Sequence, residues 1–185
     1  MERRVKGTIL KDIVIGIKSD KGHEKEYDEI LSDEAKEFLH QRVLNSVWYS
    51  WDILRELYKA LIKIVAKNDR NIVIKWGNNF GENVMSSIYK NVIAEGKVDK
   101  LVEKYRRFHG LIYNFGTMSV EKLSDNEILF TYRDIDDKFE MWYYGALGWT
   151  QRVLEMCLKK KVSFTFLKKS WQGDKETQFK LFWSP

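Results

Sequence analysis

The fold is decided by residues 162–183, which read VSFTFLKKSWQGDKETQFKLFW. Large apolar side chains alternate with polar ones in two runs, residues 162–166 and 179–183. A period of two predicts strands that bury one face. The turn residues Gly173 and Asp174 lie between the runs, so the stretch predicts an antiparallel hairpin.

The segment before this hairpin has the period of a helix. Residues 139–158 place large apolar side chains three and four positions apart. The lysines at 159–161 suit a helix C-terminus, where the helix dipole favours cations. Farther upstream, alternation in steps of two returns over residues 118–120 and 128–132, with a turn signal at 124–126. The C-terminal half is therefore predicted to be a hairpin–helix–hairpin unit.

The N-terminal half is predicted to be mostly helical. Its first segment, residues 5–17, is rich in β-branched side chains and flanked by glycines, so we expect a strand or a strand with a turn. Three helix starts follow, at Ser32, at Ser50 and at residues 68–69, each before apolar residues at helical spacing.

The fold class follows from joining the two halves. Gly96 suits the end of the helix that begins after residue 69, and a further helix is expected over residues 98–109. No linker, repeat or low-complexity tract is visible, so one domain over residues 1–185 is expected. We predict an α+β fold in which a helical N-terminal half packs on an antiparallel sheet built by the C-terminal hairpin–helix–hairpin unit.

Composition narrows the class of protein. The chain has 185 residues, of which 44% are hydrophobic, enough for a sizeable core. A single cysteine, Cys157, excludes an internal disulfide and favours a reducing cytoplasm. The net charge is +5, which permits an anionic partner but does not demand one, because acidic and basic residues are mixed along the chain. The basic clusters lack the interleaved aromatic residues of a single-strand groove, so nucleic acid is not expected as a partner. Residues 1–7 lack the apolar core of a signal peptide, and no apolar run reaches the length of a membrane span.

Large aromatic rings are the main candidates for a ligand site. The chain has seven tryptophans, and rings of this kind line cores and binding sites alike. We expect a pocket between the helical layer and the C-terminal sheet, with rings giving shape and His109 and Tyr113 orienting a ligand. The expected lining residues are Trp76, Phe80, His109, Tyr113, Trp142 and Trp149.

Other features have a structural explanation beside a chemical one. His109 suits a helix interface as well as a ligand role. Cys157 lies on an apolar helix face, which favours a buried, inert thiol over a nucleophile. Residues 77–81, GNNFG, match no phosphate loop, so their glycines indicate close approach of a neighbouring helix or ligand. The acids within residues 134–137 favour capping of the next helix over a cation site, and no metal site is expected.

The order of elements resembles a superfamily that includes the heme-nitric-oxide/oxygen-binding (H-NOX) domains, the 4-vinyl reductase domains and the vesicle-tethering TRAPP subunits. The residues that carry the likeness are 145–149, Leu154, 162–166, 173–174 and 179–183. Within that group the chain is most similar to a heme-less bacterial family of unknown function. That finer likeness is carried by residues 5–7, residues 47–49, Gly77 and Trp183.

The resemblance implies a heme site that this sequence does not reproduce. H-NOX domains hold heme through a helical histidine and a Tyr-x-Ser-x-Arg motif, and His109 stands where that histidine is expected. At the motif the chain has Tyr132, Asp134 and Asp136, and the two acids would repel heme propionates. The cysteines typical of the last hairpin of 4-vinyl reductase domains are replaced by residues such as Thr177. We therefore expect no cofactor.

These observations favour a non-catalytic, sensory domain that binds a small apolar or aromatic molecule. The resemblance to tethering subunits leaves open a protein-interaction or homodimerisation module. A heme-binding gas sensor is the third alternative. No combination of nucleophile, base and orienting group indicates an enzyme.

Overall fold

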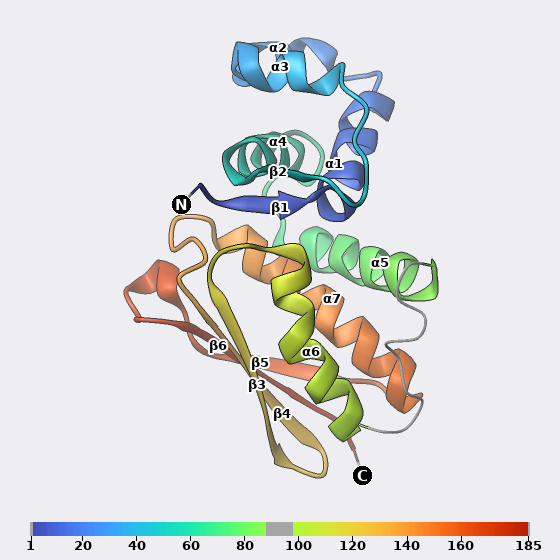
Figure 1. The fold of residues 1–185 in the computed structure, drawn as a ribbon, viewed down its shortest axis with the longest axis vertical. Coiled ribbons are helices and arrows are strands. Elements are labelled where there is room, and N and C mark those ends of the chain that lie inside the picture. The colour runs from blue at the N-terminus through green and yellow to red at the C-terminus, as the bar shows by residue number, and fades with distance from the viewer. Residues whose placement is uncertain (1, 88–97, 185) are drawn as a thin grey trace. The chain divides into compact units, whose positions relative to one another are not determined.

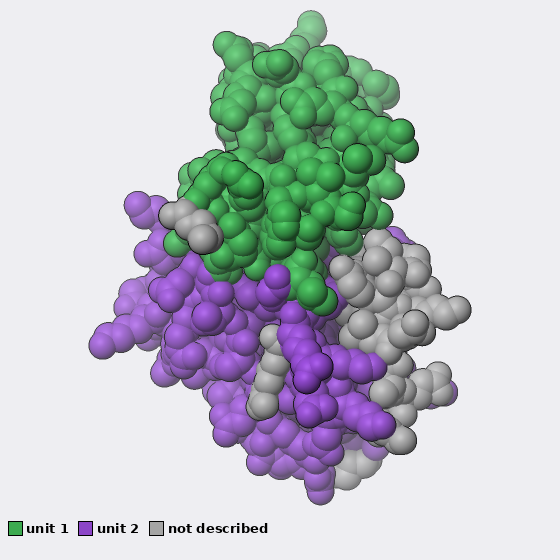
Figure 2. Space-filling model, in the orientation of Figure 1, with its two compact units in different colours: residues 1–69, 111–115 green, residues 70–110, 116–185 purple. Residues whose placement is uncertain are grey.

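The computed structural model describes residues 2–87 and 98–184. The chain forms two compact units, shown in green and purple in Figure 2. Unit 1 comprises residues 1–69 and 111–115, and unit 2 comprises residues 70–110 and 116–185. One domain over residues 1–185 stays a prediction, because two compact units occur within single domains as well as between domains.

Unit 1 is a small helical body with a two-stranded ribbon (Figure 1). Strands β1 and β2 pair antiparallel, and the edge of β1 also bridges Tyr113, with Val5 as its partner. The elements are β1 (Arg4–Lys6), α1 (Gly7–Ser19), α2 (Glu24–Ile30), α3 (Asp33–Leu39), β2 (Trp48–Ser50) and α4 (Trp51–Ile64).

The strand predicted over residues 5–17 is wrong for most of its length. Only residues 4–6 are extended, and α1 begins at Gly7. Leu10, Ile13 and Ile17 are all buried, so the apolar residues follow the helical period despite their β-branched neighbours. Burial of one face against the rest of unit 1 therefore outweighs the local β preference.

The predicted helix starts in unit 1 are confirmed by their capping hydrogen bonds. The Ser32 hydroxyl accepts from the backbone N–H of Ala35 at 3.2 Å, at the start of α3. The Ser50 hydroxyl accepts from the N–H of Asp52 at 3.2 Å, at the start of α4. Each bond satisfies one of the backbone donors that a helix N-terminus leaves without a partner.

Unit 2 contains three α-helices, one short 3-10 helix and a four-stranded antiparallel sheet among its described residues. The strand order is β3-β4-β6-β5, so the two predicted hairpins join through their inner strands, β4 and β6. The elements are α5 (Arg70–Ser87), α6 (Val98–Ile112), β3 (Thr117–Ser124), β4 (Glu127–Arg133), α7 (Glu140–Leu158), β5 (Ser163–Lys168), the short 3-10 helix η2 (Ser170–Gln172) and β6 (Thr177–Phe182).

The inner face of this sheet carries the core of unit 2. Phe130 of β4 stacks on Phe179 of β6, with ring centroids 5.4 Å apart, and both side chains are fully buried. Tyr105 of α6 packs edge-on against Phe130 at 5.4 Å, which places α6 on the same face. The α+β class and the hairpin–helix–hairpin unit are thus confirmed. The helix end predicted at Gly96 lies outside the described residues.

Candidate functional site

Helices α5 and α7 of unit 2 cross at very short range because glycines line the crossing. A Cβ at Gly77 would overlap the backbone carbonyl of Gly145, and a Cβ at Gly148 would overlap that of Ile74. Gly81 faces the indole ring of Trp149 in the same way. The predicted close approach of a neighbouring helix at residues 77–81 is therefore confirmed, and α7 is that helix.

Trp149 is the centre of a ring cluster beside this crossing. Its indole lies between Phe80 of α5 and Phe108 of α6, with centroid distances of 5.5 and 4.9 Å and nearly perpendicular planes. The indole N–H is buried and has no hydrogen-bond partner among the described residues. The side-chain oxygen of Asn78, next to Gly77 on α5, is also buried and has no hydrogen-bond partner among the described residues. Buried polar atoms of this kind are rare and need an explanation.

A second ring cluster surrounds Tyr132 on the inner face of β4. Trp142 and Tyr143 of α7 lie edge-on to it at 5.4 and 6.2 Å, and Phe179 of β6 lies at 5.7 Å. The imidazole of His109 approaches the same ring from α6, with a centroid distance of 6.5 Å. All five side chains are buried.

Tyr105 adds a buried hydroxyl to the interior of unit 2. Its side chain is 3% exposed, and its hydroxyl has no hydrogen-bond partner among the described residues. Burial raises the pKa of this phenol well above its ordinary value, and Tyr132 and Cys157 raise it further. The hydroxyl therefore remains protonated and has a hydrogen to donate.

The structure brings together some of the predicted lining residues. Phe80 and Trp149 touch directly, while His109 and Trp142 meet through the ring of Tyr132. Tyr113 belongs to unit 1, where it packs edge-on against Trp51 at 6.2 Å and Phe115 at 5.7 Å. Trp76 is half-buried on α5. A pocket lined by all six residues stays a prediction.

The rings that connect these residues were not predicted from the sequence as part of a site. Phe108, Phe130 and Tyr105 lie on faces that periodicity had already assigned to the core. Periodicity gives the face on which a ring lies, but it does not show whether a polar tip on that face finds a partner. Tyr105 was therefore indistinguishable from an ordinary core residue.

Burial confirms one prediction for a single residue, and hydrogen bonding shows that the predicted capping of α7 by the acids of residues 134–137 is wrong. Cys157 is 1% exposed on α7, which confirms the buried thiol. The Asp136 carboxylate accepts from the backbone N–H of Lys138 at 3.0 Å, within the turn before α7. The cap of α7 itself is Phe139, which makes no side-chain capping bond. Among the described residues, no group of three acidic, histidine or cysteine side chains is placed to hold a metal ion.

The residues at the expected heme clamp do not fit heme propionates. Asp136 is 8% exposed, and a buried carboxylate at this place repels another carboxylate. Asp134, which the resemblance puts in place of the serine of the motif, has a left-handed backbone conformation, with φ of 56°. His109, which the resemblance puts in place of the axial ligand, is buried beside Tyr132. Asp134 and Asp136 thus do not supply the hydroxyl and the guanidinium that the H-NOX resemblance implies for a propionate clamp.

The fold of this chain is similar to that of solved H-NOX structures, although the sequence matches no known family. No protein-family model matches the sequence, and no curated protein matches it. Among solved structures, an H-NOX protein from S. oneidensis in the Fe(II)NO ligation state has a TM-score of 0.70 at 11% identity, over 97% of this chain and 99% of that one. A mutant of T. tengcongensis H-NOX has a TM-score of 0.67 at 14% identity, over 97% and 98%.

A third solved structure is similar over nearly the whole chain. An oxygen-binding H-NOX domain related to soluble guanylate cyclases has a TM-score of 0.66 at 13% identity, over 97% of this chain and 95% of that one. None of the helices in the described part of the chain combines the length and apolarity needed to cross a bilayer. The likeness covers nearly the whole chain, and we conclude that the chain has the H-NOX fold.

Proposed function

We propose that this chain is a non-catalytic sensory domain that binds a small aromatic or apolar molecule within unit 2, without heme. The single observation that carries the proposal is the indole N–H of Trp149, buried between two rings without a partner among the described residues. The H-NOX fold supports it, because solved proteins with this fold are described as binding oxygen or nitric oxide.

The unpartnered polar atoms indicate what the ligand carries. A buried donor without an acceptor costs about 1–3 kcal/mol, which a ligand recovers when it supplies the acceptor. Trp149 and Tyr105 each hold such a donor among rings that favour flat, apolar molecules. The ligand is therefore expected to have an aromatic or apolar body with at least one hydrogen-bond acceptor.

The proposed lining keeps the predicted residues that belong to unit 2 and adds the rings that connect them; Tyr113, which belongs to unit 1, is not part of it. Phe108 and Tyr105 join the set through their contacts with Trp149 and Phe130. The residues proposed from the sequence are Trp76, Phe80, His109, Tyr113, Trp142 and Trp149.

Retention of a cellular molecule is the direct test of this proposal. Protein purified from its own cells is examined by native mass spectrometry, and a bound mass of small-molecule size is expected. Trp149→Phe keeps the ring and removes the N–H, so it should lose most of the bound fraction. Trp183→Phe, at a buried tryptophan after β6, should keep it. Equal retention by the two variants, or no bound mass in the wild type, contradicts the proposal.

Absence of heme has a separate test. Hemin is added to the purified chain, and the Soret band is compared with that of hemin in buffer. We expect no shift, because Asp134 and Asp136 replace the hydroxyl and the guanidinium of the clamp. A shift that His109→Ala abolishes would contradict a heme-less domain and would restore the gas-sensor alternative.

A second function, a homodimerisation module, is favoured by the edge of the sheet. Strand β5 is the last strand in the order β3-β4-β6-β5, and its Phe164 and Leu167 are 37% and 52% exposed. An edge strand with exposed apolar side chains is a template for pairing with another chain. The mass in solution tests it: a dimer that Leu167→Lys converts to monomer supports this function, and a wild-type monomer contradicts it.

A further inference from the structure

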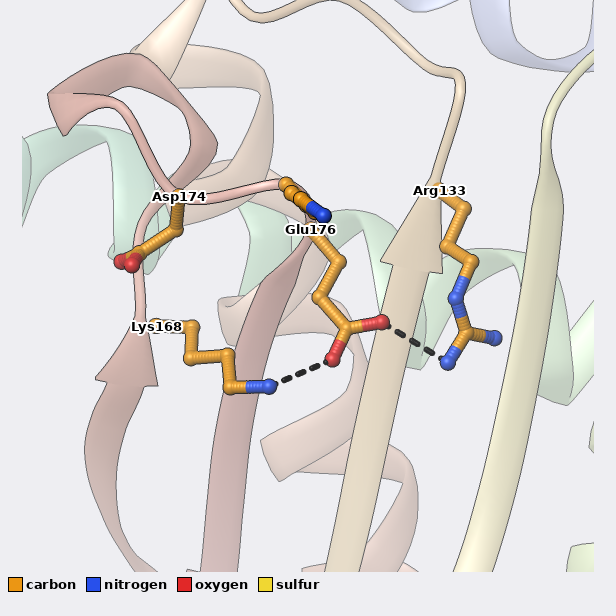
Figure 3. A pocket seen from close by; sticks show the side chains of 5 residues that line it. Arg133, Lys168, Asp174 and Glu176 are labelled. Atoms are coloured by element: carbon orange, nitrogen blue, oxygen red, sulfur yellow. Dashed lines mark hydrogen bonds and ion pairs between the residues drawn. The ribbon is translucent and has the colours of Figure 1, made fainter.

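The outer face of the sheet in unit 2 carries a hollow that the ligand proposal does not use. Its volume is about 380 Å³, and it lies where β4 and β5 end and β6 begins. Figure 3 shows side chains from the three strand ends converging on it. The residues that line it are Arg133, Lys168, Asp174, Lys175 and Glu176.

Cations outnumber acids in this hollow, and the acids are already engaged. Three basic and two acidic side chains leave a net charge of +1. One oxygen of Glu176 pairs with the Arg133 guanidinium at 2.7 Å, and the other pairs with the Lys168 ammonium at 2.8 Å. Asp174 accepts from the backbone N–H of Lys169 at 2.6 Å. Positive charge therefore remains for a further anion.

Glu176 is held as an anion inside the hollow. Its side chain is only 13% exposed, whereas those of Arg133 and Lys168 are about half exposed. The hydrogen bond from Lys168 and the charge of Arg133 lower the pKa of this carboxyl below its ordinary value. Two cations thus converge on an oxyanion that belongs to the chain itself.

Lys175 differs from Arg133 and Lys168 in its ion pairing. It lines the hollow, yet no ion pair joins it to an acid among the described residues. Arg133 uses one terminal nitrogen of its guanidinium for Glu176, and the planar group has further donors for a second oxyanion. Lys175 and Arg133 are therefore able to bind an added anion while the ion pairs of Glu176 stay in place.

The backbone around the hollow is fixed by the connection between β5 and β6. Gly173 has φ of 103°, a conformation that favours glycine, and it ends the short helix η2. The N–H of Ser170 donates to the Thr177 hydroxyl at 3.1 Å, and the N–H of Gln172 donates to the Lys169 carbonyl at 2.9 Å. A connection with these internal bonds holds its charged side chains near one place.

We propose that this hollow binds a small phosphate-type oxyanion, with Arg133, Lys168 and Lys175 as its cationic contacts. Glu176 occupies two of these cations when the site is empty. A doubly charged tetrahedral anion suits the site better than a single carboxylate, because three cations surround the hollow and a phosphate group offers more acceptor oxygens. The site is separate from the ring clusters, which lie on the inner face of the sheet.

The ordinary explanation for such residues is a set of surface ion pairs, which bind nothing. The chain contains a matched pair of acids that separates this explanation from the proposal. Glu127 pairs with Lys180 at 2.6 Å on the same outer face but does not line the hollow. Glu176→Gln and Glu127→Gln each remove one negative charge and release an ion-paired lysine.

The test measures binding of inorganic phosphate to the full chain by calorimetry, at constant ionic strength set with chloride. The wild type should bind phosphate, and Glu176→Gln should tighten the dissociation constant by about tenfold, as expected for one nearby charge. Glu127→Gln should change it by less than about twofold, since screening weakens a more distant charge. Equal tightening by both variants would show a response to net charge alone and would overturn the proposal.

Removal of a cation from the hollow should weaken phosphate binding, the opposite of the change expected for Glu176→Gln. The melting temperature of each variant shows whether it is still folded. Lys175→Gln breaks no ion pair among the described residues, so it should leave the melting temperature unchanged and weaken phosphate binding by about fivefold. Lys180→Gln is its control and should leave binding unchanged. Failure of both the wild type and Glu176→Gln to bind phosphate at tens of millimolar would also overturn the proposal.

Discussion

The two units of this chain fill their cores with different kinds of side chain. Unit 1 packs mainly aliphatic residues, and unit 2 packs aromatic rings between its helices and its sheet. The fully or nearly fully buried residues of unit 1 include Leu10, Leu54, Leu57, Ile62 and Ile64. Those of unit 2 include Tyr105, Phe130, Tyr132, Tyr143 and Phe179.

This difference separates a scaffold from a region able to recognise a ligand. Aliphatic side chains contribute burial and shape, and they leave no polar atom to satisfy. Rings such as Tyr105 and Trp149 contribute comparable burial but bring a donor into the interior. In unit 2 three of these donors, on Tyr105, Trp149 and Trp171, have no hydrogen-bond partner among the described residues, so its interior contains places at which a ligand is able to bind specifically. Unit 1 also contains a buried indole N–H, that of Trp51, so the two units differ in degree.

The largest expected effect tests the aliphatic core of unit 1. Leu54 is fully buried on α4, and Leu54→Ala should destabilise the protein by about 2–5 kcal/mol through lost burial and a cavity. Ile15 of α1, at 49% exposed, is the control, and Ile15→Ala should cost less than about 1 kcal/mol. Urea denaturation measures both. Equal losses would contradict the assignment of unit 1 as a tightly packed scaffold.

The next effect tests the helix crossing of unit 2. Gly148→Ala would press a methyl group on the carbonyl of Ile74, so it should destabilise the protein by about 1–3 kcal/mol. Gly110 of α6 faces open space, and Gly110→Ala should instead stabilise by up to about 1 kcal/mol through helix propensity. Thermal melts of the two variants should therefore shift in opposite directions, and two shifts of the same sign would disprove the close crossing.

A smaller effect sharpens the contrast between partnered and unpartnered tyrosines. Tyr105→Phe removes a buried hydroxyl without a partner among the described residues, so it should be neutral or stabilise the ligand-free protein by about 1 kcal/mol. Tyr143 is matched in burial, but its hydroxyl accepts from Ser170 at 3.2 Å. Tyr143→Phe should destabilise by about 1 kcal/mol. A loss of stability in Tyr105→Phe would show that its hydroxyl is satisfied in solution.

The smallest effect concerns pH and the hollow of unit 2. The pKa of Glu176 is lowered in the folded chain by its hydrogen bond with Lys168 and by Arg133, so its contribution to stability is complete above the ordinary carboxyl pKa of 4.5. That contribution is lost as the pH falls through the lowered folded pKa. The melting temperatures of wild type and Glu176→Gln should therefore differ at pH 6 and converge toward pH 3. A constant difference over this range would contradict the pairing.

The sequence predicted the elements of unit 2 better than those of unit 1. Alternation around Gly173 and a long helical period before it were sufficient for the second hairpin and α7. For residues 5–17 the β-branched side chains suggested a strand, although Leu10, Ile13 and Ile17 already stood at helical spacing. The segment forms a helix because packing within unit 1 buries one helical face. The local β preference of its side chains does not depend on that packing, so it could not predict the helix.

The candidate sites were predicted only in part, for a similar reason. Periodicity put Trp149 and Phe80 on facing helices, but the missing partner of the indole N–H is a property of the folded interior. The charged hollow was not predicted at all. Arg133 and Glu176 lie far apart in the sequence and meet only because β4 pairs with β6 in one particular register.

The pairing of β4 with β6 also has a consequence for folding: we expect it to form after the two hairpins of unit 2. Each hairpin closes over few residues, 125–126 in the first and 169–176 in the second, whereas Phe130 and Phe179 are separated in the chain by the whole of α7 and β5. Closing so long a loop is slow and costs chain entropy before any contact repays it. The inner face of the sheet, with its ring clusters, therefore becomes complete late, and a nascent chain exposes two separate apolar hairpins until the two central strands meet.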